Sequence, residues 1–186
     1  MHEDAVDGIV IRRARTADVA GIRRLVDVYA PARQLLSKAT VTLYEDIQEF
    51  LVAEAVSEAG AAAGQPGASG AARIVGCGAL HVMWEDLAEI RTIAVDPDWH
   101  GRRIGHRLAT GLLDNARRLG VERVFVLTFE TEFFSRHGFV PIDGAPVPHR
   151  VYEELLRSYD EGVAEFLDLE RVKPNTLGNT RMLLTL

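Results

Sequence analysis

The residues best suited to chemistry lie in "EIRTIAVDPDWHGRRIGHRLATGLLDNARRLG", which begins at Glu89. This stretch opens with strand-like alternation and stops at Asp96-Pro97; glycines and arginines follow, and then a long amphipathic helix begins. The first N–H groups of a helix lack intrahelical partners and carry partial positive charge. Glycine allows the backbone to approach a ligand closely, and arginine adds formal charge. The combination predicts a binding site for phosphate or pyrophosphate.

Two familiar phosphate-binding motifs do not fit this loop. A Walker P-loop requires Lys followed by Ser or Thr after its second glycine, whereas His106 follows Gly105 here. A dinucleotide-binding fingerprint requires three glycines at G-x-G-x-x-G spacing, which the loop lacks. For the loop taken alone, a plain turn with solvated arginines is the alternative interpretation.

The bulk composition excludes several classes of protein. The chain has 186 residues, 47% of them apolar, and a net charge of −6, so we expect one ordinary domain and no nucleic-acid partner. Cys77 is the only cysteine, which excludes an intramolecular disulfide and a thiolate metal cluster, and the six histidines show no paired metal-ligand spacing. We expect no metal. With no apolar run long enough to span a bilayer, we expect no membrane contact and a cytoplasmic protein.

Hydrophobic periodicity predicts an α/β fold with the element order β-α-α-β-β-β-α-β-α-β-α-β, in which helices pack on a mixed sheet. The segment 58–72, rich in Ala, Gly and Ser, is expected to be a flexible hairpin insertion in a single domain that covers residues 1–186. The expected strands are Gly8–Ala14, Phe50–Val56, Ala72–Trp84, Ala88–Val95, Glu122–Phe129, Gly138–Ile142 and Thr180–Leu186. The expected helical segments are Thr16–Ala30, Val41–Glu49, Arg102–Leu119, Thr131–His137 and Val151–Leu167.

The series formed by "IAVDPDW", "HGRRIG", the helix, "VFVLTF" and "FFSRHGF" resembles the GNAT superfamily of acetyl-CoA-dependent N-acetyltransferases. The resemblance implies a GNAT fold, with a mixed, mostly antiparallel sheet of about six to seven strands and helices on both faces. It also implies acetyl-CoA as co-substrate and allows a homodimer. Its most specific part covers Glu89–Phe139.

The family's loop pattern, Q/R-x-x-G-x-G/A, holds the CoA pyrophosphate through backbone amides. His100 stands at the Q/R place, Arg103 at the first glycine and Gly105 at the second, so the first two places depart from the pattern. Because amides do the binding, Arg103 is acceptable if it adopts the backbone angles of glycine. The cofactor-binding residues that the resemblance implies are Ile93, Ala94 and Val95, next to the thioester, and His100, Gly101, Arg102, Arg103, Ile104 and Gly105.

Glu89 is the candidate catalytic base, because acetyl transfer to an amine requires removal of a proton from the ammonium group. Strand alternation predicts that Glu89, Arg91, Ile93 and Val95 share one face. The alternative is a solvent-exposed Glu-Arg ion pair. The family's usual general-acid tyrosine is replaced by Phe134, so the proton donor to the leaving thiolate is unassigned. Ser135, Tyr152 and solvent are the candidates, solvent because a thiol is a good leaving group.

Within the superfamily, "QLLSKATVTLYEDIQEF", "EIRTIAVDPDW" and "RVFVLTFETEFFSRHGF" are most similar to the acetyltransferase domain of N-acetylglutamate synthases, in the short form without a kinase-like domain. The resemblance implies transfer of acetyl to the α-amine of L-glutamate, the first step of arginine biosynthesis. Two carboxylates on the substrate require cationic or amide donors. The candidate substrate-binding residues are Lys38, Arg91, Asn179, Thr180 and Arg181.

The same residues allow three other functions. Glutamine is nearly isosteric with glutamate and is a second candidate acceptor. Another amine, such as a peptide N-terminus, a polyamine or an aminoglycoside, is an alternative substrate, although Lys38 and Arg91 disfavour cationic ones. The alternative that is not an enzyme is a sensor of acetyl-CoA or arginine.

Overall fold

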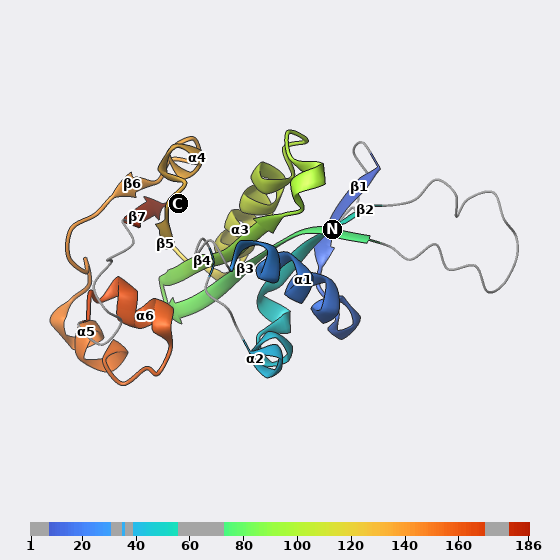
Figure 1. Ribbon diagram of the computed structural model, residues 1–186. Helices are drawn as coiled ribbons and strands as arrows, with labels where there is room; N and C mark the ends of the chain where they lie inside the picture. The colour runs from blue at the N-terminus through green and yellow to red at the C-terminus, as the bar shows by residue number, and fades with distance from the viewer. Residues whose placement is uncertain (1–7, 31–34, 36–38, 56–72, 170–178) are drawn as a thin grey trace, which may run out of the picture. The chain divides into compact units, whose positions relative to one another are not determined.

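The computed structural model describes residues 8–30, 35, 39–55, 73–169 and 179–186. Its strands form a seven-stranded sheet in the order β1-β2-β3-β4-β5-β7-β6 (Figure 1). The β4·β5 pairing is parallel, while β1·β2, β2·β3, β5·β7 and β6·β7 are antiparallel. The predicted mixed α/β fold is therefore confirmed. The strands are β1 (Ile9–Arg13), β2 (Phe50–Ala55), β3 (Arg73–Trp84), β4 (Leu87–Val95), β5 (Arg123–Thr128), β6 (Val140–Pro141) and β7 (Thr180–Thr185).

The described helices are mostly short, and none of them is long and apolar enough to cross a membrane. By contact the chain divides into two compact units, Met1–Ala79 with Thr92–Leu112, and Leu80–Arg91 with Leu113–Leu186. The helices are α1 (Val19–Tyr29), α2 (Thr40–Glu45), α3 (Ile104–Leu119), α4 (Thr131–Ser135), α5 (His149–Leu155) and α6 (Glu161–Phe166), with 3-10 turns η1 (Thr16–Asp18), η2 (Ile47–Glu49) and η4 (Pro97–Trp99).

In the first unit, helices cover both faces of the sheet. Apolar side chains at helical spacing on α1 pack with α2 against one face of β2 and β3, where Cys77 is fully buried. Gly76, the neighbour of Cys77, points to the opposite face, because successive strand residues alternate. There a Cβ on Gly76 would lie 2.9 Å from Ile104 at the start of α3. The main members of the core below α1 and α2 are Val19, Ile22, Leu25, Leu43, Phe50, Val52, Cys77 and Ala79.

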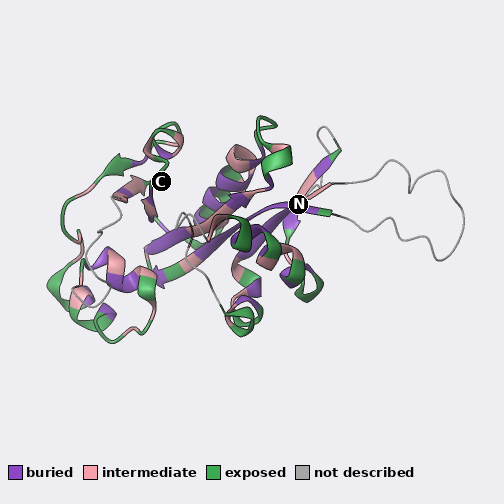
Figure 2. Cartoon of the chain, in the orientation of Figure 1, coloured by how far each residue is buried: buried purple, intermediate pink, exposed green. Residues whose placement is uncertain are grey.

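The second unit has its own core beneath α5 and α6, where β5 is mostly buried and the helices bury one side and expose the other (Figure 2). Phe125 of β5 meets Phe166 of α6 edge to face, with ring centroids 5.2 Å apart. The nearly all-apolar strand predicted around "VFVL" is thus buried, as its composition indicates. The buried members of this core are Met83, Leu87, Phe125, Val151, Leu155, Val163, Phe166 and Leu167.

Two expectations about local structure require correction. The regular alternation predicted for β4 is wrong at Thr92, which adopts a left-handed φ of 59° and therefore interrupts the period of two on which a shared face from Glu89 to Val95 depends. The single helical segment predicted for Val151–Leu167 is two helices. Asp160 separates them, because its side chain accepts a hydrogen bond from Val163 N at 3.1 Å and begins α6.

Candidate active site

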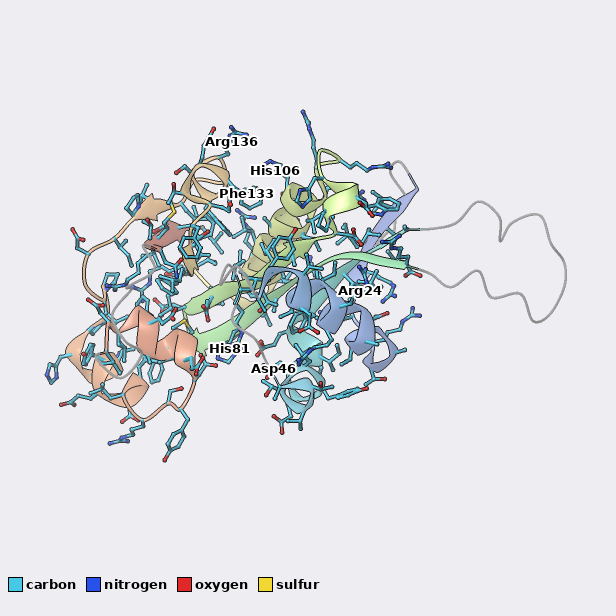
Figure 3. The ribbon with its side chains drawn as sticks, viewed as in Figure 1. Arg24, Asp46, His81, His106, Phe133 and Arg136 are labelled. Carbon is cyan, nitrogen blue, oxygen red and sulfur yellow. The ribbon has the colours of Figure 1, made fainter. Side chains whose placement is uncertain are left out.

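The candidate pyrophosphate loop follows β4 through a turn that Asp96 organises. The Asp96 carboxylate is almost fully buried; it accepts hydrogen bonds from Arg24 at 2.9 Å and Arg73 at 2.8 Å, and from Asp98 N at 3.2 Å (Arg24 is marked in Figure 3). Burial acts to raise the pKa of this carboxyl, but the arginines and the Asp98 amide outweigh it, and the pKa lies below its usual value. Asp96 is therefore a satisfied anion that fixes η4 ahead of the loop.

The loop backbone has the geometry that close approach to a ligand requires. Gly101 has a φ of 80°, and a Cβ built there would meet nothing within 4 Å. Arg103 has a φ of 56°, the left-handed conformation that glycine adopts most easily. Arginine at the place of the family's first glycine thus takes glycine-like backbone angles, as the amide-binding interpretation requires. Helix α3 begins one residue later, at Ile104.

His100 lies beside the end of β4. Its Nε2 is 3.2 Å from the Val95 carbonyl oxygen and 2.9 Å from the Tyr29 hydroxyl, which itself donates to Val95 O. Burial and the negative charge of Asp96 raise the pKa of Tyr29, so the hydroxyl remains protonated. The carbonyl of Val95 therefore already accepts a hydrogen bond from the Tyr29 hydroxyl, and the N–H groups of this strand end are the groups to consider for a ligand.

The two loop arginines are exposed on the surface. The Arg102 guanidinium lies over the Trp99 ring, 4.6 Å from its centroid, which is a cation–π contact. This contact holds one formal positive charge next to the start of α3. The positive charge and the glycine-like backbone are the two features that the predicted anion-binding loop requires.

Glu89, the candidate base, lies on β4 in the second unit and is 5% exposed. Its nearest cation is Arg91, whose Nη1 lies 3.9 Å from Oε2, and this oxygen has no hydrogen-bond partner among the described residues. Burial raises the pKa of Glu89 to about 7; Arg91 opposes this shift, and Asp160 adds to it. The alternative of a solvent-exposed ion pair is therefore wrong. A carboxylate whose pKa lies near neutrality is suited to proton abstraction.

Asp160 draws the arginine away from Glu89. Arg91 Nη1 donates to Asp160 at 2.8 Å, more than 1 Å closer than its approach to Glu89. His81, marked on β3 in Figure 3, places Nε2 3.7 Å from the same carboxylate. Burial acts to raise the pKa of Asp160, but Arg91 outweighs it, and the pKa is lowered. Asp160 is thus the ionised partner in this group.

Helix α6 lies directly against the Glu89 carboxylate. A Cβ built on Gly162 would lie 2.0 Å from Oε2, far inside any real contact. Glu165, one helical turn further on, is half-buried, and burial followed by the charges of Glu161 and Asp160 raises its pKa to about 7. Two carboxyls that titrate near neutrality therefore lie in one group.

The other predicted residues fall in different places. Lys38 and the segment 58–72 lie outside the described residues. Thr180 begins β7, where it pairs with Thr128 of β5, and Asn179 precedes it. Arg181 donates to the carbonyls of Gly144 and Phe166, so its side chain ties β7 to the adjoining loop and helix.

Phe134 occupies the place of the family's tyrosine and belongs to the interior. It is 5% exposed and packs against Phe133 and Phe139, with centroid distances of 5.0 and 5.3 Å. It carries no group that could protonate the leaving thiolate.

Sequence reasoning missed Asp160 and Gly162 and gave His81 no role in the site. One signal was present, because "SYDEGVAEF" places an N-capping residue and a glycine within a predicted helix. Glycine inside a helix is costly and commonly has a packing reason. The described residues contain no group of three or more His, Cys, Asp or Glu side chains arranged to hold a metal ion.

Comparison of the sequence and the structure with known proteins assigns the chain to a family. Residues 30–139 match the model of the "Acetyltransferase (GNAT) family". The chain is 59% identical to the amino-acid acetyltransferase of Mycobacterium tuberculosis over 95% of its length and 94% of that protein. The crystal structure of Rv2747 from Mycobacterium tuberculosis, in complex with CoA and NLQ, superposes with a TM-score of 0.81 at 58% identity, covering 95% of this chain and 99% of that one.

N-acetylglutamate synthase from Neisseria gonorrhoeae, in complex with CoA and N-acetyl-glutamate, has the same fold at a TM-score of 0.69 and 23% identity. This chain covers 36% of that protein. The chain belongs to the GNAT acetyltransferase family. The family predicted from the loop, the buried strand and the "FFSRHGF" segment is therefore confirmed.

Proposed function

We propose that this protein is an amino-acid N-acetyltransferase that transfers the acetyl group of acetyl-CoA to the α-amine of L-glutamate. The observation that carries the proposal is Glu89, a carboxylate that is buried within its own unit and has a pKa near 7. In the other unit, Gly101 and Arg103 have the left-handed φ values that the expected pyrophosphate loop requires. The 59% identity to a mycobacterial amino-acid acetyltransferase supports the same class of acceptor.

The reaction needs a base, an oxyanion donor and a held cofactor. The Glu89 carboxylate takes a proton from the substrate ammonium, directly or through water, and the neutral nitrogen attacks the thioester carbonyl carbon. Backbone N–H groups of Ile93–Val95 stabilise the oxyanion of the tetrahedral intermediate. The C–S bond then breaks, the nitrogen loses its second proton to solvent as the amide forms, and the CoA thiolate leaves and takes a proton. Because Phe134 cannot supply that proton, we assign it to solvent.

The loop residues His100–Gly105 hold the CoA pyrophosphate through amides at the start of α3, with the charges of Arg102 and Arg103 adding attraction. The two carboxylates of glutamate require donors, and we assign this task to Lys38, Arg91, Asn179, Thr180 and Arg181. Of these, Arg91 lies beside Glu89, which supports a place next to the reacting amine.

The deciding experiment measures release of the CoA thiol from acetyl-CoA in the presence of L-glutamate, L-glutamine, L-ornithine or L-lysine. We expect turnover with glutamate or glutamine and none with the two cationic amino acids. The ratio of kcat/KM for glutamate to kcat/KM for glutamine defines the preferred acceptor. Tight acetyl-CoA binding without turnover on any of the four would refute glutamate as the acceptor and favour a different acceptor or a sensor.

A further inference from the structure

The backbone of α6 lies against one side of the Glu89 carboxylate, and the carboxylate keeps this position only because residue 162 is glycine. A Cβ at this position would lie 2.0 Å from Glu89 Oε2, 2.7 Å from Cδ and 2.9 Å from Oε1. We infer that Gly162 is a positioning residue for the proposed reaction: the space left by its missing side chain is where the Glu89 carboxylate lies. This inference rests on the proposed function and extends it to a residue of α6.

The first turn of α6 is fixed more firmly than the tip of Glu89. Asp160 caps the helix through Val163 N, and Ala164 N donates to the Asp160 carbonyl at 3.2 Å. Val163 and Ala164, the two residues after Gly162, are buried in the core of the second unit. The atoms that would meet a new Cβ are the end of a side chain with three rotatable bonds. A larger residue at position 162 therefore moves the carboxylate rather than the helix.

Asp160 completes this arrangement by joining α6 to β4. Its carboxylate accepts from Arg91 at 2.8 Å and lies 3.7 Å from His81 Nε2. The strand that carries Glu89 and the helix that carries Gly162 are thus held together by an ion pair next to the contact itself. This ion pair restrains α6 from moving away from Glu89 when residue 162 gains a side chain.

Displacement of the carboxylate has a direct chemical cost. A general base must lie within hydrogen-bond reach of the proton that it removes, and an error of about 1 Å in placement costs on the order of 100-fold in rate. Alanine is a better helix former than glycine, so Gly162→Ala favours an isolated helix. A loss of activity in that variant therefore cannot come from helix propensity.

The test compares Gly162→Ala with Gly111→Ala, a matched control in α3 of the first unit. A Cβ on Gly111 would lie 2.9 Å from Leu51 Cδ1, so it also crowds the tip of a flexible side chain, but one without chemistry. Both variants are assayed for kcat, for the KM of acetyl-CoA, and for kcat/KM from pH 5 to 9. The amino-acid acceptor is the one that the wild-type chain turns over.

We expect Gly162→Ala to lose at least about tenfold in kcat with an unchanged KM for acetyl-CoA. We also expect the acid limb of its pH profile to move to lower pH, because a displaced carboxylate gains water. Gly111→Ala should keep the wild-type kcat and the wild-type acid limb. Wild-type kcat together with a wild-type acid limb in Gly162→Ala would overturn the inference.

A double-mutant cycle in Tm tests the contact between residue 162 and Glu89 without an activity assay. Gly162→Ala should lower the Tm of the wild-type chain but not that of a Glu89→Ala chain, in which the clashing atoms are gone. An equal fall in both backgrounds, or failure of the double variant to fold, would refute the contact. If instead Glu89→Gln keeps full activity while this coupling in Tm stands, the proposed base is wrong and the packing role of Gly162 is right.

Discussion

Asp96 and Glu89 are two carboxylates that the protein buries to nearly the same extent, 3% and 5% exposed, in its two units. Asp96 accepts hydrogen bonds from two arginines and a backbone N–H, and its pKa is lowered. Glu89 has one arginine at 3.9 Å, and its pKa is raised to about 7.

The difference between the two sites teaches that low exposure of the carboxyl group itself does not decide its charge. The donors within reach and the exposure of the surroundings decide it together, since the Arg24 and Arg73 side chains beside Asp96 are 44% and 52% exposed. In the loop unit, donors converge on Asp96 and make a rigid anion that holds a turn. In the other unit, Asp160 takes the arginine that would otherwise neutralise Glu89. The first arrangement suits a structural role, and the second suits a proton acceptor.

The largest expected effect is on catalysis. Glu89→Gln replaces the base with an isosteric amide that cannot take a proton, so kcat should fall by about 100-fold or more. The measurement is steady-state thiol release with the preferred amino acid. Glu153→Gln, at an exposed position of α5, is the matched control and should retain wild-type kcat. Near-normal kcat in Glu89→Gln would remove Glu89 from the mechanism.

The second effect is on stability and should have opposite signs at the two sites. Asp96→Asn should lower the free energy of unfolding by about 1–3 kcal/mol, because Arg24 and Arg73 lose their anion. Glu89→Gln should raise it at pH 8, by about 1–3 kcal/mol, because it removes a buried, poorly compensated charge.

The pH dependence provides the check on this second effect. The pKa of Glu89 is about 7 in the folded chain against an ordinary value of 4.5, so ionisation costs stability progressively from pH 4.5 to 7 and fully above that range. The gain in Glu89→Gln should therefore shrink between pH 8 and pH 5 in urea unfolding. A gain that is independent of pH would contradict the assigned cause.

A smaller effect separates the two carboxyls that titrate near 7. The value of kcat/KM should rise with pH around 7 as Glu89 loses its proton, and this limb should vanish in Glu89→Gln. Glu165→Gln removes a neighbouring negative charge, so the limb should persist and move to lower pH by less than about one unit. Loss of the limb in Glu165→Gln would instead identify Glu165 as the titrating group.

The smallest effect is expected at the exposed loop arginine. If amides hold the pyrophosphate, Arg103→Ala should raise the KM of acetyl-CoA by less than about fivefold, and less at high salt, since an exposed charge contributes about 1 kcal/mol or less. Arg103→Gly should behave similarly, because glycine accepts the φ of 56° without strain. A loss above about 100-fold in either variant would assign the binding to the side chain.

The sequence predicted the parts of the molecule that local rules control. Alternation and helical spacing placed the main strands and α3, and the glycine-arginine loop after β4 led to the correct family. What it could not supply were contacts between distant segments and a local break in regularity. Asp160 meets Arg91 across 69 positions of the chain, and Thr92 leaves the strand's period through a backbone angle that no pattern of residue types marks.

The contact between Arg102 and Trp99 makes the loop observable by spectroscopy. Indole emission responds to a charge above the ring, so a diphosphate that draws the guanidinium away from Trp99 changes the fluorescence of the protein itself. The chain has two tryptophans, and Trp84→Phe leaves Trp99 as a single native reporter. Acetyl-CoA binding then becomes a titration that needs neither a label nor turnover, and it can be read in variants with low turnover, as expected for Glu89→Gln.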